Sequence, residues 1–313
     1  MNFFKALAFV FSTSEKAERF RRVWEARKVT RDAWIEAGGC SECSKSCKRK
    51  HVVGIGSDPM PATVSRVASP DFASLATTLR PPTRVQTGIP GLNATLGGGF
   101  VLGSMVALSG SPGVGKSTLA LQAADGVTRS TGRSVMYASG EQSVVDMQMF
   151  ATRLGISERE DIYLRGNDSD VYRIVDECTA RGCAMLVVDS LHTAYMDDVA
   201  SDVGSISQMR AVANYLASFA KETNTIVLLL LHVRRDGEAA GPSDVAHLAD
   251  TNLRLDRDYD VDDPRARILE TGKNRYGREG VVARFEMTAT GFLLSNGEVR
   301  WLDSMAISVD IEL

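Results

Sequence analysis

The stretch Gly110-Ser111-Pro112-Gly113-Val114-Gly115-Lys116-Ser117, followed by Thr118, decides the fold of this chain. It fits the pattern G-x-x-x-x-G-K-S/T, a glycine-rich turn between a strand and a helix. A strand-like run, 104–109, precedes it and a helical pattern follows. The N–H groups of such a turn and the positive end of the helix form a cradle for a triphosphate. We expect these residues to bind it, with Lys116 at the β- and γ-phosphates and the Ser117 hydroxyl on Mg²⁺.

Apolar runs alternate with helical patterns after this turn and before it. The strand candidates are 104–110, 134–140, 161–166, 183–190 and 225–233. The runs Met185–Val188 and Ile226–Leu231 are apolar throughout, which is typical of parallel strands covered on both faces. A helical pattern at 205–222 is long enough for a crossover. Shorter runs at 252–255, 267–270, 281–287 and 292–295 indicate antiparallel hairpins. The sequence therefore predicts an α/β fold with a mostly parallel sheet and C-terminal antiparallel edge strands.

Two acidic residues follow predicted strands. Asp189 ends the run Met185–Val188, so its carboxylate is expected at the carboxyl edge of the sheet beside the glycine-rich turn, where it would hold Mg²⁺ through water. A helix or turn cap is the alternative. Glu141 follows the strand candidate 134–140 and would stand at the same edge, where it would activate the attacking water. Its alternative is a first-turn glutamate that complements a helix dipole.

The charge of the chain is uneven. Its 313 residues have a net charge of −3, but residues 1–51 carry 12 Lys/Arg and 6 Asp/Glu, which leaves −9 for the rest. A basic leader suits a polyanionic partner, although a solvated, charge-mixed helix at 14–37 explains it equally well. We predict a leader at 1–51, a flexible Ser/Pro/Ala-rich linker at 52–82 and an α/β domain at 83–313.

The leader also holds Cys40, Cys43, Cys47 and His51, four potential ligands within twelve residues. Three thiolates and one imidazole suit Zn²⁺. The alternative is a basic tether with free thiols. The other two cysteines, Cys178 and Cys183, flank an apolar strand candidate and are expected in the core.

From about Arg84 to Leu294 the sequence resembles the ATPase core of the bacterial RadA (Sms) family, RecA-like hexameric DNA motors. The matching segments are Thr87-Gly-Ile, Leu96-Gly-Gly-Gly-Phe, the phosphate loop with Leu121-Gln122, Ser139-Gly-Glu141, Asp189-Ser-Leu-His-Thr193, Gly204-Ser-Ile-Ser-Gln-Met-Arg210, His232-Val, Ala240-Gly-Pro242, His247 and Lys273-Asn-Arg-Tyr-Gly277. The last resembles the family's KNRFG signature, with Tyr for Phe, and is the most discriminating.

The resemblance implies roles for four residues. Glu141 is the catalytic base, and His232 lies where RecA-like proteins sense the γ-phosphate of ATP. Lys273 and Arg275 act in trans on the ATP of a neighbouring subunit in a ring, where their charges stabilise the transferring phosphoryl group. The residues alone would place Lys273 and Arg275 in an exposed polar turn that ends at Gly277.

In RecA-like rings, the loops after the fourth and fifth core strands face the channel and bind DNA. The corresponding segments are about 192–208 and 233–247. The expected DNA-binding residues are Gly204, Ser205, Ser207 and Arg210 around the first segment, and Arg234 and Arg235 in the second. Small side chains and arginines contact phosphates without reading bases. The alternative is that both segments are surface loops.

The sequence departs from the family in three ways. Only about twenty residues follow Leu293, so the family's Lon-protease-like domain is expected to be absent. The HVTK-type segment reads His232-Val-Arg-Arg235. The leader has the cluster at 40–51 in place of two separated C-x-x-C pairs.

We therefore expect a ring-forming, ATP-dependent DNA motor, hexameric and helicase-like. Its partners would be single-stranded or branched DNA and a recombinase or replication protein. Two alternatives remain, a KaiC-like signalling ATPase without DNA and an adaptor that uses ATP only for assembly. No apolar run approaches the roughly 20 residues of a membrane span, so we expect a cytoplasmic protein.

Overall fold

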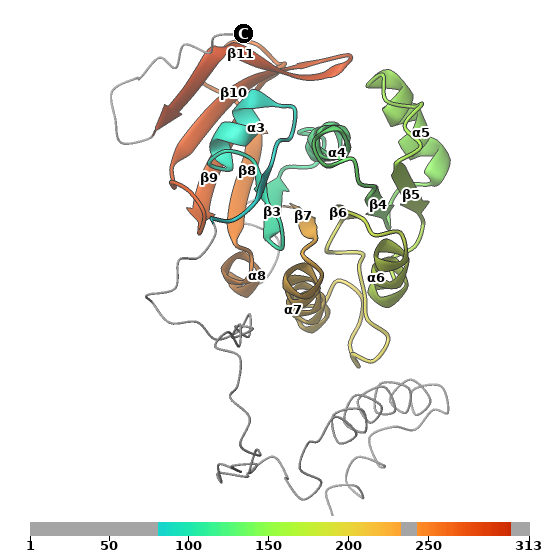
Figure 1. Ribbon diagram of the computed structural model, residues 1–313. Coiled ribbons are helices and arrows are strands. Elements are labelled where there is room, and N and C mark those ends of the chain that lie inside the picture. Colours follow the sequence, from blue (N-terminus) through green and yellow to red (C-terminus); the bar gives the residue numbers. More distant parts are fainter. Residues whose placement is uncertain (1–80, 233–242, 302–313) are drawn as a thin grey trace, which may run out of the picture. The chain divides into compact units, whose positions relative to one another are not determined.

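The computed structural model describes residues 81–232 and 243–301. A nine-stranded sheet has the order β11-β10-β9-β8-β3-β7-β6-β4-β5 (Figure 1). Its parallel strands are β3 (Met105–Gly110), β4 (Val135–Ser139), β5 (Ile162–Gly166), β6 (Met185–Asp189), β7 (Ile226–His232) and β8 (Thr251–Arg257). The antiparallel strands β9 (Ala266–Asn274), β10 (Val281–Thr288) and β11 (Gly291–Trp301) extend it beyond β8. The predicted α/β architecture is confirmed. One strand differs from the prediction, because β8, which contains the run 252–255 expected in an antiparallel hairpin, pairs in parallel with β3 on one side and antiparallel with β9 on the other.

Helices cover both faces of this sheet (Figure 1). On one face lie α3 (Pro90–Thr95), α4 (Lys116–Thr131) and α5 (Val144–Arg153), and on the other lie α6 (Val171–Ala180), α7 (Ile206–Thr223) and α8 (Ser243–Leu248). Two short strands, β1 (Arg84–Val85) and β2 (Phe100–Val101), form a separate antiparallel pair. The helices α4 and α7 are the long crossovers that parallel strands require.

Alternate residues of each central strand belong to two different cores. In β3, Val106 and Leu108 pack with the α4 side, while Met105 and Ala107 pack with the α7 side. Both faces exclude water along Met105–Leu108, so each of these four positions is apolar. This explains the continuous apolar runs in the sequence. Cys178 and Cys183 are buried in the second core, as expected.

The start of α5 excludes one of the two interpretations of Glu141. Ser143 is the N-cap of this helix, and it forms a capping box with Asp146. Glu141 therefore lies before the cap, and the acidic residue of the first turn is Asp146. The alternative that Glu141 is a first-turn glutamate is wrong, because the helix begins only after Ser143, two residues further along the chain.

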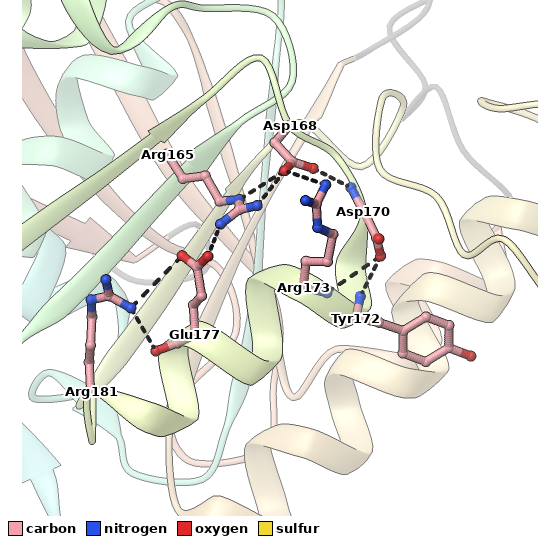
Figure 2. A network of polar contacts seen from close by, with 7 residues as sticks. All are labelled: Arg165, Asp168, Asp170, Tyr172, Arg173, Glu177 and Arg181. Carbon is pink, nitrogen blue, oxygen red and sulfur yellow. Dashed lines mark hydrogen bonds and ion pairs between the residues drawn. The ribbon is translucent and has the colours of Figure 1, made fainter. Parts of the chain in front are cut away.

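A polar network joins β5 to α6 (Figure 2). Arg165 forms ion pairs with Asp168 and Glu177, and Asp168 also accepts a hydrogen bond of 3.0 Å from the N–H of Asp170. Asp170 caps α6 by accepting from two N–H groups of its first turn. The backbone of Asp170 pairs with Tyr195 in a parallel bridge. The network thus holds the β5–α6 loop against the segment that follows β6.

Several predictions lie outside the described residues. These are the basic leader at 1–51 with its helix at 14–37, and all but the end of the linker at 52–82. None of the helices within the described ranges has the length and apolar character that a membrane span requires.

Candidate nucleotide-binding site

The glycine-rich turn leaves the carboxyl end of β3 and leads directly into α4. Gly115 is the N-cap of α4, with a φ of 112°, a conformation that L side chains rarely adopt. A Cβ added there would lie 2.7 Å from the ring of Phe292. The first N–H groups of a helix have no partner inside it, so they are available to an anion. The turn therefore has the shape and polarity of a phosphate cradle.

Lys116 lies over this turn and is only 6% exposed. Its ammonium donates hydrogen bonds to the carbonyl oxygens of Gly110 (2.8 Å) and Ser111 (3.1 Å). Burial lowers the pKa of Lys116, although the negative charges of Asp189 and Glu141 oppose the shift. The cation is thus held at the turn, where the phosphates of a bound nucleotide would meet it.

Ser117 and Asp189 meet between α4 and β6. The Ser117 hydroxyl donates to Oδ2 of Asp189 at 2.7 Å, and the Tyr137 hydroxyl donates to the same oxygen at 2.7 Å. Burial and the charge of Asp189 raise the pKa of Tyr137 well above its usual value, so it remains a donor. A hydroxyl and a carboxylate side by side are the hard oxygen ligands that Mg²⁺ prefers. The pair fits the predicted Mg²⁺ site, with Ser117 as direct ligand and Asp189 acting through water.

Glu141 lies at the same edge of the sheet, beyond the end of β4. Its Oε1 accepts a hydrogen bond from the Ser190 hydroxyl at 2.9 Å and lies 3.1 Å from Nε2 of His232. Burial raises the pKa of Glu141, but the hydrogen bonds of His232 and Ser190 outweigh it, so the pKa lies below its usual value. The side chain is 46% exposed. An ionised, oriented carboxylate that water can reach is what a general base requires.

Lys273 and Arg275 lie at the opposite edge of the sheet. Lys273 is in β9, and the next residue, Asn274, pairs with Thr251 at the start of β8. The phosphate loop begins at the far end of β3, and six residues of strand span about 17 Å. The sequence-based alternative, a polar turn, is wrong for Lys273, because β9 continues through it. The structure therefore does not bring these two cations to the phosphate loop of their own chain.

Both cations bind groups within their own subunit. The Lys273 ammonium donates to the carbonyl oxygens of His247 and Ala249, each at 2.7 Å, at the end of α8. Burial and the neighbouring Arg275 lower the pKa of Lys273. Arg275 pairs at 2.8 Å with Asp250, which is buried, while the arginine side chain is 49% exposed. About half of the Arg275 side chain is thus open to solvent at this edge.

Comparison with known proteins agrees with this geometry. The family described as "AAA domain" matches residues 76–238, more than half of the chain. The DNA repair protein RadA of Rickettsia typhi is 38% identical over 226 residues, which cover 71% of this chain and 49% of that protein. RadA of Brucella abortus is 32% identical over 262 residues, covering 82% and 55%. The chain belongs to the AAA domain family and is a member of the RadA family.

The chain spans about half the length of the RadA relatives it matches. Among solved structures, a KaiC-like protein from Pyrococcus horikoshii aligns with a TM-score of 0.57 at 21% identity, over 69% of this chain and all of that one. At this identity the match shows a shared fold. The RadA-family chain therefore has a RecA-like P-loop ATPase core, and the resemblance seen in its sequence is confirmed.

The first predicted DNA segment of this RadA-family chain is tied to α7. Ser205 is the N-cap of α7 and accepts from the N–H of Gln208, while Gly204 before it has a φ of 76°. Ser207 and Arg210 lie on the exposed side of the first turns. Gln208 is buried, and its side-chain amide donates to the carbonyl oxygens of Met196, Val199 and Ser201. DNA contacts by Gly204, Ser205, Ser207 and Arg210 stay a prediction.

Two groups of predicted residues lie outside the described ranges. Arg234 and Arg235 belong to 233–242, and the proposed zinc ligands Cys40, Cys43, Cys47 and His51 belong to 1–80. Zinc binding and the DNA contacts of these arginines stay predictions.

Sequence analysis missed two polar residues of this site, Tyr137 and Ser190, and the buried Gln208 at the start of α7. For Tyr137 a signal existed, since a phenol within an apolar strand run needs a buried hydrogen-bond partner. Ser190 and Gln208 carry no such signal, because their partners come from other strands and loops.

Proposed function

We propose that this protein hydrolyses ATP while bound to single-stranded or branched DNA, and that it acts in DNA repair. One observation carries the ATPase part. Glu141 follows β4, and Asp189 ends the adjacent strand β6. Because Ser139 of β4 is paired with Asp189, the base and the Mg²⁺-binding acid lie at the same edge of the sheet as the phosphate loop. The DNA part is supported by the RadA relatives, which are DNA repair proteins.

The residues at this edge of the sheet divide most steps of the mechanism among them. Bound Mg²⁺, held by Ser117 and Asp189, would neutralise charge on the phosphate oxygens. Lys116 leaves the carbonyls of its own turn and binds the β- and γ-phosphates. Glu141 accepts the proton of a water whose oxygen attacks the γ-phosphorus, while the bond to the ADP oxygen breaks. His232 and Ser190 hold the carboxylate in place and keep it ionised before the attack.

A ring, with six subunits as in the family, supplies the remaining charges. Lys273 and Arg275 lie a strand length from their own phosphate loop, so they would serve the neighbour's nucleotide. Their action in trans ties hydrolysis to assembly and provides the coupling of a DNA motor. We place this activity in the cytoplasm, with a recombinase or replication protein as a candidate partner.

ATP hydrolysis, measured with and without single-stranded DNA, tests the proposal. We expect Mg²⁺-dependent hydrolysis that single-stranded DNA stimulates, together with a molar mass several times that of one chain. Hydrolysis that DNA leaves unchanged would contradict the DNA part, and would favour an oligomeric ATPase without DNA. Absence of hydrolysis under both conditions would contradict the ATPase part.

DNA binding should depend on backbone phosphates rather than on sequence. Its affinity is expected to fall with salt with a log–log slope of about −0.7 for each phosphate neutralised on a single strand. The double variant Arg234→Ala, Arg235→Ala should make this slope less steep by the contribution of about one to two phosphates. It should also lower DNA-stimulated hydrolysis and leave DNA-independent hydrolysis unchanged. Titrations over a salt series measure this, and an unchanged slope would remove both arginines from the DNA path.

A further inference from the structure

Arg267 occupies a core position of β9. The buried positions of this strand alternate, and Arg267 shares its face with Leu269 and Thr271. Arg267 is only 6% exposed, and within the described residues it has no carboxylate at ion-pair distance. A buried charge is costly unless its surroundings compensate it. An arginine at an apolar position of the alternation therefore needs a reason.

The guanidinium of Arg267 is compensated by three carbonyl oxygens, and one of them belongs to the phosphate loop. Its Nε donates to the carbonyl of Val114 at 3.0 Å, and its Nη1 donates to Pro264 at 2.8 Å and Ala266 at 2.9 Å. Burial lowers the pKa of Arg267, and Arg257 adds to this shift, but an arginine stays protonated in proteins. The loop thus has a permanent cation bound to the back of one of its peptide units.

The geometry of that peptide unit connects the cation to the cradle. In a trans peptide the C=O of one residue and the N–H of the next point in opposite directions. The carbonyl of Val114 and the N–H of Gly115 belong to one such unit. When Arg267 holds the carbonyl outward, the N–H of Gly115, at the start of α4, must point inward. The orientation of a loop donor is therefore set by a side chain 153 residues away.

The antiparallel strands also restrict this peptide sterically. Phe292 of β11 and Met287 of β10 lie against Gly115, where they would contact an added Cβ at 2.7 and 3.1 Å. The N–H of Phe292 donates to Oε1 of Gln122 in α4 at 2.8 Å, which fastens β11 to the helix that begins at the loop. The antiparallel strands β9–β11 therefore pack against the phosphate loop at Val114 and Gly115.

We propose that Arg267 is a positioning residue for nucleotide binding. It fixes the Val114 carbonyl so that the Gly115 N–H faces the phosphate oxygens, and it places a positive charge directly behind them. The inference rests on the proposed nucleotide-binding function. The ligand chemistry is a di- or triphosphate, whether free or part of a nucleotide.

Calorimetric titration with Mg²⁺–ADP and with inorganic pyrophosphate tests this role. We expect Arg267→Met to raise the Kd for both probes by at least about tenfold, the low end for loss of a charge-assisted hydrogen bond. Arg267→Lys, which keeps the charge but not the fork of donors, should lie between Arg267→Met and the wild type. Arg265→Met is the matched control. Its side chain is 60% exposed and pairs with Asp263 and Glu286, so its Kd values should equal those of the wild type.

The outcomes separate this inference from the proposed function. Absence of binding by the wild type would contradict nucleotide binding itself. Tight binding by the wild type and by folded Arg267→Met alike would overturn only the role of Arg267, as would a lower melting temperature with an unchanged Kd. If Arg267→Met does not fold, the comparison passes to Arg267→Gln and Arg267→Lys. Equal pyrophosphate affinity in both and in the wild type then overturns the inference.

Discussion

Replacement of Lys273 or Arg275 by alanine should lower ATP hydrolysis by at least about 10³-fold, the low end for a cation delivered across an interface, while ATP binding is retained. The reason is the position of the two cations, which are attached to α8 and Asp250 at the sheet edge opposite the phosphate loop. In the proposed ring they would act on a phosphoryl group bound to another subunit. Hydrolysis rates and Kd values for ATP measure the effect, with Lys221→Ala, at an exposed lysine of α7, as control.

Mixed assemblies of two variants test directly whether Lys273 acts in trans. Lys116→Ala subunits lack the charge of the phosphate loop, and Lys273→Ala subunits lack the delivered cation. A mixture contains interfaces that join one intact loop to one intact cation, so part of the activity should return. The same mixture controls for folding, because an unfolded subunit restores nothing. If the subunits exchange and activity does not return, Lys273 does not act in trans.

The Glu141→Gln variant should bind ATP normally and hydrolyse it at least about 10²-fold more slowly, the low end for a positioned general base. Glutamine has the same shape, and its carbonyl oxygen can still accept from Ser190 and His232, but it cannot take a proton from water. Single-turnover hydrolysis and a separate binding titration distinguish the two steps.

The surface variant Glu158→Gln is the matched control for this change, since Glu158 is exposed and lies in the turn after α5. It should hydrolyse ATP at the wild-type rate. Hydrolysis by Glu141→Gln at a similar rate would place the base elsewhere. Loss of ATP binding together with hydrolysis would instead assign Glu141 to the cradle.

Parts of this protein that depend on neighbours in the chain were predictable from sequence. The phosphate loop is one, because the turn, its glycines and the following helix are contiguous. The apolar runs of β6 and β7 are another, since burial on both faces favours apolar residues at every position before the strand reaches the sheet edge. Asp189 was predictable as well, because the end of a buried parallel strand must reach the edge of the sheet.

Only the tertiary structure decided which distant groups meet. The order β8-β3-β7-β6-β4 differs from the order in the chain, and it brings Glu141, Ser190 and His232 together from three strand ends. It also places Arg275 at the opposite edge and Arg267 behind the phosphate loop. Local preferences act over a few residues, whereas these contacts arise from strand pairing and from the need of each buried charge or hydroxyl for a partner. That need is met wherever the fold supplies an acceptor, and one acceptor of Arg267 lies 153 residues away.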